Sequence, residues 1–183
     1  MDIANSEKLE LRKRFRSERS LRDKAESWTH ILNSSEFEAA KTIASYISYG
    51  DEPQTKDLNL AILKSGKNLA LPRVLRDKSL EWVIWSGAES GLVKSGKILE
   101  PIGDAIAPTS IEIVIVPTLH ATREGHRLGQ GGGSYDRALA QSSAWRIGLI
   151  YSGELTIEPF PVEAHDVKLN AIATPDLIVR FTN

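Results

Sequence analysis

The sequence of 183 residues contains no cysteine. Disulfides, thiolate metal sites and cysteine nucleophiles are therefore excluded. The longest apolar run, around residues 111–116, is far too short for a membrane span, and the N-terminal segment lacks the apolar core of a secretory signal. The formal net charge is −1, so the chain has no strong overall field for nucleic acid or a membrane surface. We expect a cytoplasmic protein that binds neither of them.

The composition is that of an ordinary folded protein, with 41% hydrophobic and 26% charged residues. A chain of this length buries about 70% of its unfolded surface on folding, so it needs no disulfide or structural metal. No linker of unusual composition and no internal repeat interrupts the sequence. We therefore predict one domain that spans residues 1–183.

Apolar periodicity predicts alternating helices and strands. Helices are predicted at residues 6–32 with Ser6 as N-cap, at a short segment that Thr55 caps and Gly66 ends, and at residues 134–141. Strands are predicted at residues 42–48, 68–72 (where Pro72 ends the strand), 79–85, 112–117 and 145–151, with two short strands near the C-terminus. Most of these strands are continuously apolar, which is typical of a parallel sheet covered on both faces. The prediction is an α/β fold, a layered sandwich with a mostly parallel central sheet flanked by helices.

Residues 126–137, HRLGQGGGSYDR, form the densest glycine segment, with Gly129 and Gly131 to Gly133 within five positions. Such a segment is costly to order, because glycine loses more backbone freedom than any other residue. It follows the apolar strand that ends at Pro117, and ligands of open α/β sheets bind outside the carboxyl ends of the strands. Bare backbone lets a phosphate approach closely, and Arg127 adds a fork of donors for its oxygens. The segment therefore predicts a phosphate-binding loop.

Three better-known motifs do not match this loop. No lysine follows the glycines, as a P-loop requires, and Ser134 stands where the dinucleotide fingerprint needs its last glycine. The segment GGGSYD also differs from the nucleophile elbow of serine hydrolases.

Several of these features have alternative interpretations. The glycine loop could be a flexible turn without a ligand, and Asp136 could stabilise a helix dipole rather than hold Mg²⁺. Glu52, just beyond the first strand, could meet a ligand or be merely exposed. Eight of the 23 Lys and Arg residues lie between Glu7 and Lys24, where they could line a phosphate site, bind RNA or form a solvated helix face.

The segment from Arg127 to Asp136 resembles the R-L-G-x-G-x-G-Y-Y-D signature of the 5-formyltetrahydrofolate cyclo-ligase family. Shorter segments resemble the family in the same order along the chain. These are Lys8 with Arg12, Glu52 with Thr55, Leu71-Pro72-Arg73, Glu100-Pro101, Ile115-Val116-Pro117 and His165-Asp166. The resemblance thus extends over nearly the whole chain.

The resemblance implies an α/β sandwich and an ATP- and Mg²⁺-dependent ligase that acts on a reduced folate, with no obligate protein partner. By it, the ATP-binding residues are Lys8, Arg12, Arg127, Leu128, Gly129, Gln130, Gly131, Gly132, Gly133, Ser134 and Tyr135. The folate-binding residues are Ile47, Glu52, Gly131, Gly133 and Tyr135, and Mg²⁺ is held by Asp136 and Asp166. Arg127 and Tyr135 are the implied catalytic residues.

The sequence departs from the family pattern in three places. Ser134 replaces the first tyrosine of the signature, residues 117–122 replace P-G-L-x-F-D, and residues 150–154 end in Glu154 where the family pattern A-F-x-x-Q has glutamine. These changes are expected on the folate side of the site. A divergent homologue that binds ATP without closing the folate ring, or a ligase with a different substrate, is therefore the alternative hypothesis.

Overall fold

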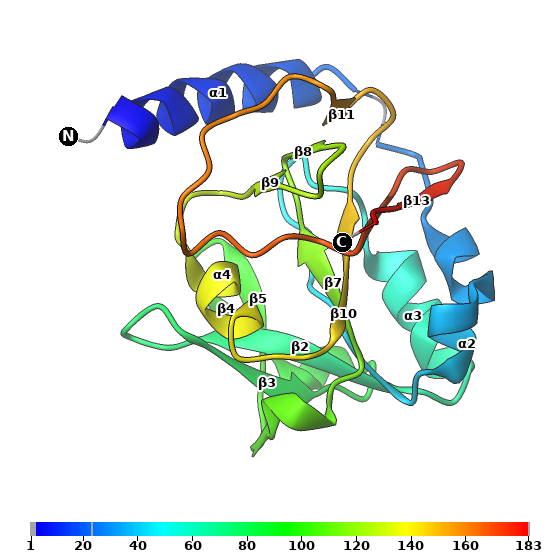
Figure 1. The fold of residues 1–183 in the computed structure, drawn as a ribbon. Helices are drawn as coiled ribbons and strands as arrows, with labels where there is room; N and C mark the ends of the chain where they lie inside the picture. The colour runs from blue at the N-terminus through cyan, green and yellow to red at the C-terminus, as the bar shows by residue number, and fades with distance from the viewer. Residues whose placement is uncertain (1–2, 23, 183) are drawn as a thin grey trace.

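The computed structural model describes residues 3–22 and 24–182, and Figure 1 shows how their helices and strands are arranged. The helices are α1 (Ile3–Arg19), α2 (Ser35–Ala39), α3 (Lys56–Lys64) and α4 (Ser134–Leu139), and the 3-10 helices are η1 (Thr29–Asn33), η2 (Glu89–Gly91) and η3 (Pro108–Ser110). The strands are β1 (Thr42–Ala44), β2 (Asn68–Val74), β3 (Leu80–Ile84), β4 (Leu92–Ser95), β5 (Ile98–Pro101), β6 (Ala105–Ile106), β7 (Ile113–Pro117), β8 (His120–Thr122), β9 (Arg127–Leu128), β10 (Trp145–Leu149), β11 (Leu155–Thr156), β12 (Ala171–Ala173) and β13 (Ile178–Arg180).

The main sheet has the strand order β13-β12-β10-β7-β1-β2-β3-β6. The neighbours from β12 to β2 run parallel, whereas β13 at one end and β3 and β6 at the other are antiparallel. The apolar strand β7 pairs with β1 on one side and β10 on the other, as its sequence predicts. The mostly parallel central sheet is therefore confirmed.

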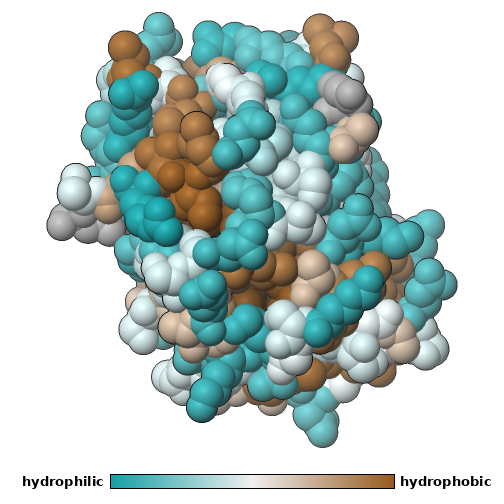
Figure 2. Space-filling model, turned by 90° about the vertical axis from the view of Figure 1, so that its right-hand side faces the viewer, coloured by the Kyte–Doolittle hydropathy of each residue, from teal (hydrophilic) through white to brown (hydrophobic). Residues whose placement is uncertain are grey.

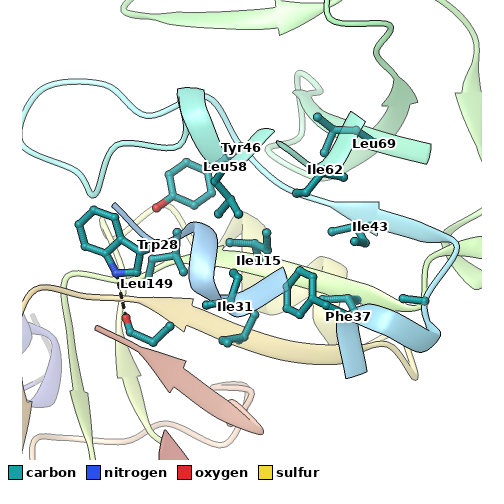
Figure 3. Close-up of a cluster of buried hydrophobic side chains, with 14 of the residues drawn as sticks. Trp28, Ile31, Phe37, Ile43, Tyr46, Leu58, Ile62, Leu69, Ile115 and Leu149 are labelled. Atoms are coloured by element: carbon teal, nitrogen blue, oxygen red, sulfur yellow. Dashed lines mark hydrogen bonds between the residues drawn. The ribbon is translucent and has the colours of Figure 1, made fainter. Parts of the chain in front are cut away.

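The two faces of the sheet carry separate apolar cores, because successive side chains of a strand point to opposite faces. Ile43, Ile113 and Ile115 belong to one core, which packs against η1, α2 and α3 (Figure 3). Ala44 and Val114 belong to the other, which includes α4. Helices thus cover both faces, and the layered sandwich is confirmed. On the face shown in Figure 2, hydrophobic residues gather in areas bordered by hydrophilic ones.

The long helix predicted for residues 6–32 is wrong in both its bounds. Helix α1 begins at Ile3, so Ser6 lies within it and is not its N-cap. The helix ends at Arg19, and Leu21 beyond it is 87% exposed. Trp28 continues the apolar spacing but belongs to the main core (Figure 3). Its indole N–H donates to the carbonyls of Ile150 and Ala173. Tertiary packing therefore overrides the helical periodicity after Arg19.

Three smaller predictions also need correction. Strand β1 ends at Ala44 rather than at residue 48. Strand β2 continues through Pro72, which is possible because its pairing with β1 stops at Ala70 and no N–H is needed on that side. Helix α3 begins after Thr55 as predicted, but the Thr55 hydroxyl donates to the carbonyl of Tyr46 at 2.7 Å and does not cap the helix.

The connection from β7 to α4 is longer than most strand-to-helix loops because it contains its own strands. Strands β8 and β9 form a hairpin in a second sheet with the order β11-β8-β9. This small sheet lies beneath α1 in Figure 1. The glycine segment, residues 129–133, joins β9 to α4, and a separate hairpin pairs β4 with β5.

Candidate active site

A cavity of about 600 Å³ opens beside the glycine segment, where α1, the β2–β3 and β4–β5 hairpins and residues 163–166 meet. Every residue that the sequence predicts for ATP, folate or metal lines this one cavity. These residues are Lys8, Arg12, Ile47, Glu52, Arg127, Leu128, Gly129, Gln130, Gly131, Gly132, Gly133, Ser134, Tyr135, Asp136 and Asp166. The fold therefore brings the predicted site together, although the role of each residue stays a prediction.

The glycine segment is shaped by two left-handed residues. Gly131 has a φ of +100° and Gly133 a φ of +67°, conformations that other residues adopt with strain. A Cβ on Gly131 would also lie 3.3 Å from Cζ of Arg12, closer than most such contacts. The glycines thus allow the loop to turn tightly beneath the arginine of α1.

Arg127 is held inside the loop by a nearly buried ion pair. Its guanidinium donates to Oδ1 of Asp136 at 2.7 Å, and its side chain is 5% exposed. Asp136 Oδ1 also accepts the backbone N–H of Val167 at 3.2 Å. The buried Nε of Arg127 has no hydrogen-bond partner among the described residues, so this donor is left unsatisfied beside the cavity.

Lys8 and Arg12 reach the cavity from successive turns of α1. Lys8 is 4% exposed and donates to Glu163 at 2.7 Å and Asp166 at 2.6 Å. Burial alone would lower the pKa of Lys8, but these two carboxylates hold it above the ordinary value. Arg12 donates to the carbonyl of Gly129 at 3.0 Å, which ties α1 to the glycine segment. Positive charge is thus fixed on one wall of the cavity.

Glu52 stands on the far side of the glycine segment and is 6% exposed. Burial raises its pKa, while hydrogen bonds from the backbone N–H of Tyr49 and the side chain of Gln130 oppose the shift. Burial also raises the pKa of Tyr135, and the charge of Glu52 adds to the effect. The buried Tyr135 hydroxyl has no hydrogen-bond partner among the described residues. These groups offer a carboxylate and a neutral hydroxyl to a polar ligand.

The candidate metal ligands fall into two places. Ligand atoms of Glu163, His165 and Asp166 all lie within 4.8 Å of one another, whereas Asp136 is paired with Arg127. Burial would raise the pKa of Asp166, but hydrogen bonds from Lys8 and from the backbone of Glu163 hold it below its usual value. A charged carboxylate beside a second one is a donor set that suits Mg²⁺. Sequence reasoning missed Glu163, which no motif marked.

Sequence reasoning also missed an apolar wall opposite the cations. It is formed by Val74 and Leu80 of the β2–β3 hairpin and by Ile98 and Leu99 of β5. Leu99 is 45% exposed and Val74 is 39% exposed, so this wall presents apolar surface to the solvent of the cavity. Such a wall suits a flat, partly apolar ligand. Ile98 and Leu99 lie in the four-residue strand β5, which is too short to give a periodic pattern.

The three departures from the family pattern do not lie together in the structure. Ser134 lines the cavity, but Glu154 is paired with Arg19 at the end of α1. His120, in the altered segment after β7, stacks on Phe15 of α1 with ring centroids 3.8 Å apart. Glu154 and His120 therefore contact α1, and neither of them lines the cavity.

Helix α1 is also not the solvated basic face that its composition suggests. Lys8, Arg12, Arg16 and Arg19 all donate hydrogen bonds to other parts of the chain, and the acceptor of Arg16 is Gln130. The helix uses these cations to attach itself over the cavity, which leaves fewer of them for an RNA backbone. None of the helices among the described residues is both long and apolar enough to cross a membrane.

Fold and site together define an α/β protein with a cationic, glycine-lined cavity beside a mostly parallel sheet. Residues 6–175 match the model of the 5-formyltetrahydrofolate cyclo-ligase family. The chain belongs to this family of ligases.

Named relatives agree with the match. The 5-formyltetrahydrofolate cyclo-ligase of Mycolicibacterium smegmatis is 31% identical over 152 residues, covering 75% of this chain and 75% of the relative. The enzyme of the same name from Escherichia coli K12 is 31% identical over 148 residues, covering 76% and 80%. The solution structure of 5,10-methenyltetrahydrofolate synthetase from Aquifex aeolicus aligns with a TM-score of 0.83 at 26% identity, over 96% of this chain and 93% of that one.

Proposed function

We propose that the chain converts 5-formyltetrahydrofolate into 5,10-methenyltetrahydrofolate at the expense of ATP, with release of ADP and phosphate. The observation that carries the proposal is the convergence of Lys8, Arg12 and Arg127 with the glycine segment on one cavity, in a chain of this family. We expect the reaction to take place in the cytoplasm, in a single domain and without an obligate partner.

The chemistry requires activation of a poor leaving group. The formyl oxygen attacks the γ-phosphorus of ATP, an O–P bond forms, and the bond from that phosphorus to ADP breaks. N10 of the folate then attacks the activated formyl carbon, loses its proton, and inorganic phosphate leaves as the C–O bond breaks. Phosphoryl transfer of this kind depends mainly on positioning and charge neutralisation, so no protein nucleophile is needed.

The ATP phosphates would lie against the cationic wall. Lys8 and Arg12 would contact them from α1, and the segment from Arg127 to Tyr135 would surround them with backbone N–H groups. The free Nε of Arg127 could donate to the oxygens of the transferred group, where charge develops. Arg127 and Tyr135 are therefore the proposed catalytic residues.

Mg²⁺ would be held on the same side, by Asp136 and Asp166, with Glu163 as a further carboxylate. The fit rests on the adjoining carboxylates of Glu163 and Asp166, whose oxygens are the ligands that Mg²⁺ prefers. When bound, the ion would neutralise charge on the phosphates. In its absence Lys8 neutralises the same carboxylates.

The folate would occupy the other side of the cavity. Ile47 and the apolar wall would contact its rings, and Glu52 would accept hydrogen bonds from its N–H groups. Gly131 and Gly133 present bare backbone to the cavity, and Tyr135 offers its hydroxyl.

The test is formation of the methenyl product, followed by its long-wavelength absorbance, with purified protein, 5-formyltetrahydrofolate, Mg²⁺ and ATP. We expect a rise in absorbance that needs both ATP and protein. No rise, together with calorimetric binding of ATP and none of the folate, would overturn the proposal. That result would instead support a homologue that binds ATP without closing the ring, as the change to Ser134 suggests.

A further inference from the structure

Helix α1 is attached to the body of the protein at its last residue, Arg19. The Arg19 side chain is 3% exposed, and its Nε donates to Oε1 of Glu154 at 2.9 Å. One terminal nitrogen donates to Oε2 of Glu154 at 2.5 Å and to the carbonyls of Thr118 and Leu119 at 2.8 Å. A planar guanidinium with this many acceptors has one orientation, which holds this end of α1 against the body of the protein.

Glu154 is equally well fixed. It is 4% exposed, and its Oε2 also accepts the backbone N–H of Tyr151 at 2.8 Å. The backbone N–H of Glu154 also donates to the carbonyl of Tyr151, which closes a turn over residues 151–154. This turn holds the carboxylate in place. The ion pair joins residues 135 positions apart in the sequence. It is therefore a rigid connection between α1 and the segment that follows β10.

The same face of α1 carries the residues of the cavity. Lys8, Arg12, Phe15 and Arg19 are separated by four, three and four positions, a spacing that places side chains on one face of a helix. Arg19 lies about 16 Å along the helix from Lys8, at 1.5 Å per residue. Between them, Phe15 is stacked on His120, with an angle of 8° between the rings. A shift or rotation at Arg19 would therefore move Lys8 and Arg12 as well.

We propose that the Arg19–Glu154 ion pair is a positioning contact for ATP binding, which sets α1 so that Lys8 and Arg12 reach the phosphates. The proposal rests on the proposed function for the identity of the ligand. Glu154 stands where the family pattern has glutamine. The proposal gives it a role beneath α1, whereas the sequence predicted a position beside the folate. Neither Arg19 nor Glu154 lines the cavity, so both act through the residues that do.

The experiment uses three variants: Arg19→Met, Glu154→Gln and the double variant that carries both substitutions. Each of them is compared with the control variant Glu18→Gln. Glu18 lies next to Arg19 on α1 in a solvent-exposed pair with Arg14, so its loss is the matched control. Arg19→Met leaves the buried Glu154 carboxylate without its Arg19 partner, whereas the double variant removes both charges. The double variant therefore keeps the test valid if Arg19→Met does not fold. Each variant is titrated with ATP and Mg²⁺, and separately with 5-formyltetrahydrofolate, by calorimetry well below its measured Tm.

We expect Kd and KM for ATP to rise roughly tenfold in Arg19→Met and the double variant, because misplaced contacts lose much of their effect. Glu154→Gln keeps one acceptor and leaves the Arg19 charge that acts on Glu52 in place. This variant should show a smaller rise for ATP and an unchanged Kd for the folate. Backbone amides of α1 should exchange faster with solvent in Arg19→Met than in Glu18→Gln. A lower Tm with unchanged Kd for ATP would overturn the proposal, since the pair would then be only structural.

Lys8→Met separates this inference from the function on which it rests. If Lys8→Met weakens ATP binding and Arg19→Met does not, only the positioning role is wrong. If wild-type protein binds no ATP, the proposed function itself is wrong.

Discussion

The two walls of the cavity are built in different ways. The cationic wall joins Lys8 of α1 to Asp166, 158 positions later in the sequence, and Arg127 to Asp136. Lys8 and Arg127 are thus already paired with carboxylates, whereas Arg12 donates to the carbonyl of Gly129. The apolar wall comes from β2, β3 and β5, and Leu99 on it remains 45% exposed.

The difference indicates how each wall would meet its ligand. An anion at the cationic wall must exchange hydrogen bonds with carboxylates that already hold Lys8 and Arg127, so the wall is positioned in advance. A ring at the apolar wall only displaces water from exposed side chains. We therefore expect changes to the cationic wall to have large and specific effects, and changes to the apolar wall to have small ones.

The largest effect is expected for Arg127→Ala. The substitution removes the proposed contact to the transferred phosphate and leaves Asp136 without its ion-pair partner. We expect kcat/KM for ATP to fall on the order of a hundredfold. Steady-state kinetics with varied ATP measures this change, and Arg123→Ala, which removes an exposed arginine between β8 and β9, is the control. If kcat/KM for ATP were equal in the two variants, Arg127 would have no role in catalysis.

Asp166→Asn tests the metal side of the cationic wall. Loss of one carboxylate charge should raise the Mg²⁺ concentration for half-maximal rate by about tenfold, because Mg²⁺ prefers charged oxygen ligands. The rate is measured against Mg²⁺ at fixed ATP, with Asp104→Asn, an exposed residue between β5 and β6, as control. Superimposable curves for wild type and Asp166→Asn would remove Asp166 from the proposed metal ligands.

A pH dependence of stability is expected from His120, beneath α1. Burial, and then the charges of Arg19, Arg14 and Arg22, lower the pKa of His120 from 6.5 to about 4. Between these two values the unfolded chain binds the proton more readily than the folded one. The free energy of unfolding should therefore decrease as the pH falls from 6.5 to about 4. Urea unfolding at several pH values measures the decrease.

His120→Phe is the control for this dependence, because a phenyl ring can stack on Phe15 and does not titrate. The decrease in stability over the same pH range should be smaller in this variant. An equal decrease in both proteins would assign the effect to other groups.

The smallest effect is expected for Leu99→Ala on the apolar wall. Loss of part of an exposed apolar contact should raise KM for 5-formyltetrahydrofolate by about fivefold and leave KM for ATP unchanged. Val93→Ala, on the neighbouring strand β4 and 49% exposed, is the matched control because Val93 does not line the cavity. A rise in KM for ATP of similar size would mean that the two walls are not distinct.

The two walls also differ in how far the sequence predicts them. The glycine segment and the strand before it are local signals, so they identified Arg127, Asp136 and the sheet that positions them. Leu99 gave no signal because a short hairpin strand has too few residues for a pattern. The end of α1 at Arg19 was missed because Trp28, which continues the apolar spacing, packs in the core against Ile150 and Ala173, far away in the sequence. Contacts of that kind follow from tertiary packing and not from propensity.

The most direct test of the two-wall account is a pair of calorimetric titrations, one with ATP and Mg²⁺ and one with 5-formyltetrahydrofolate, on wild type, Arg127→Ala and Leu99→Ala. The account predicts that Arg127→Ala weakens ATP binding and spares the folate, while Leu99→Ala does the reverse. If either variant weakened both ligands equally, the division of the cavity into an ATP wall and a folate wall would be contradicted.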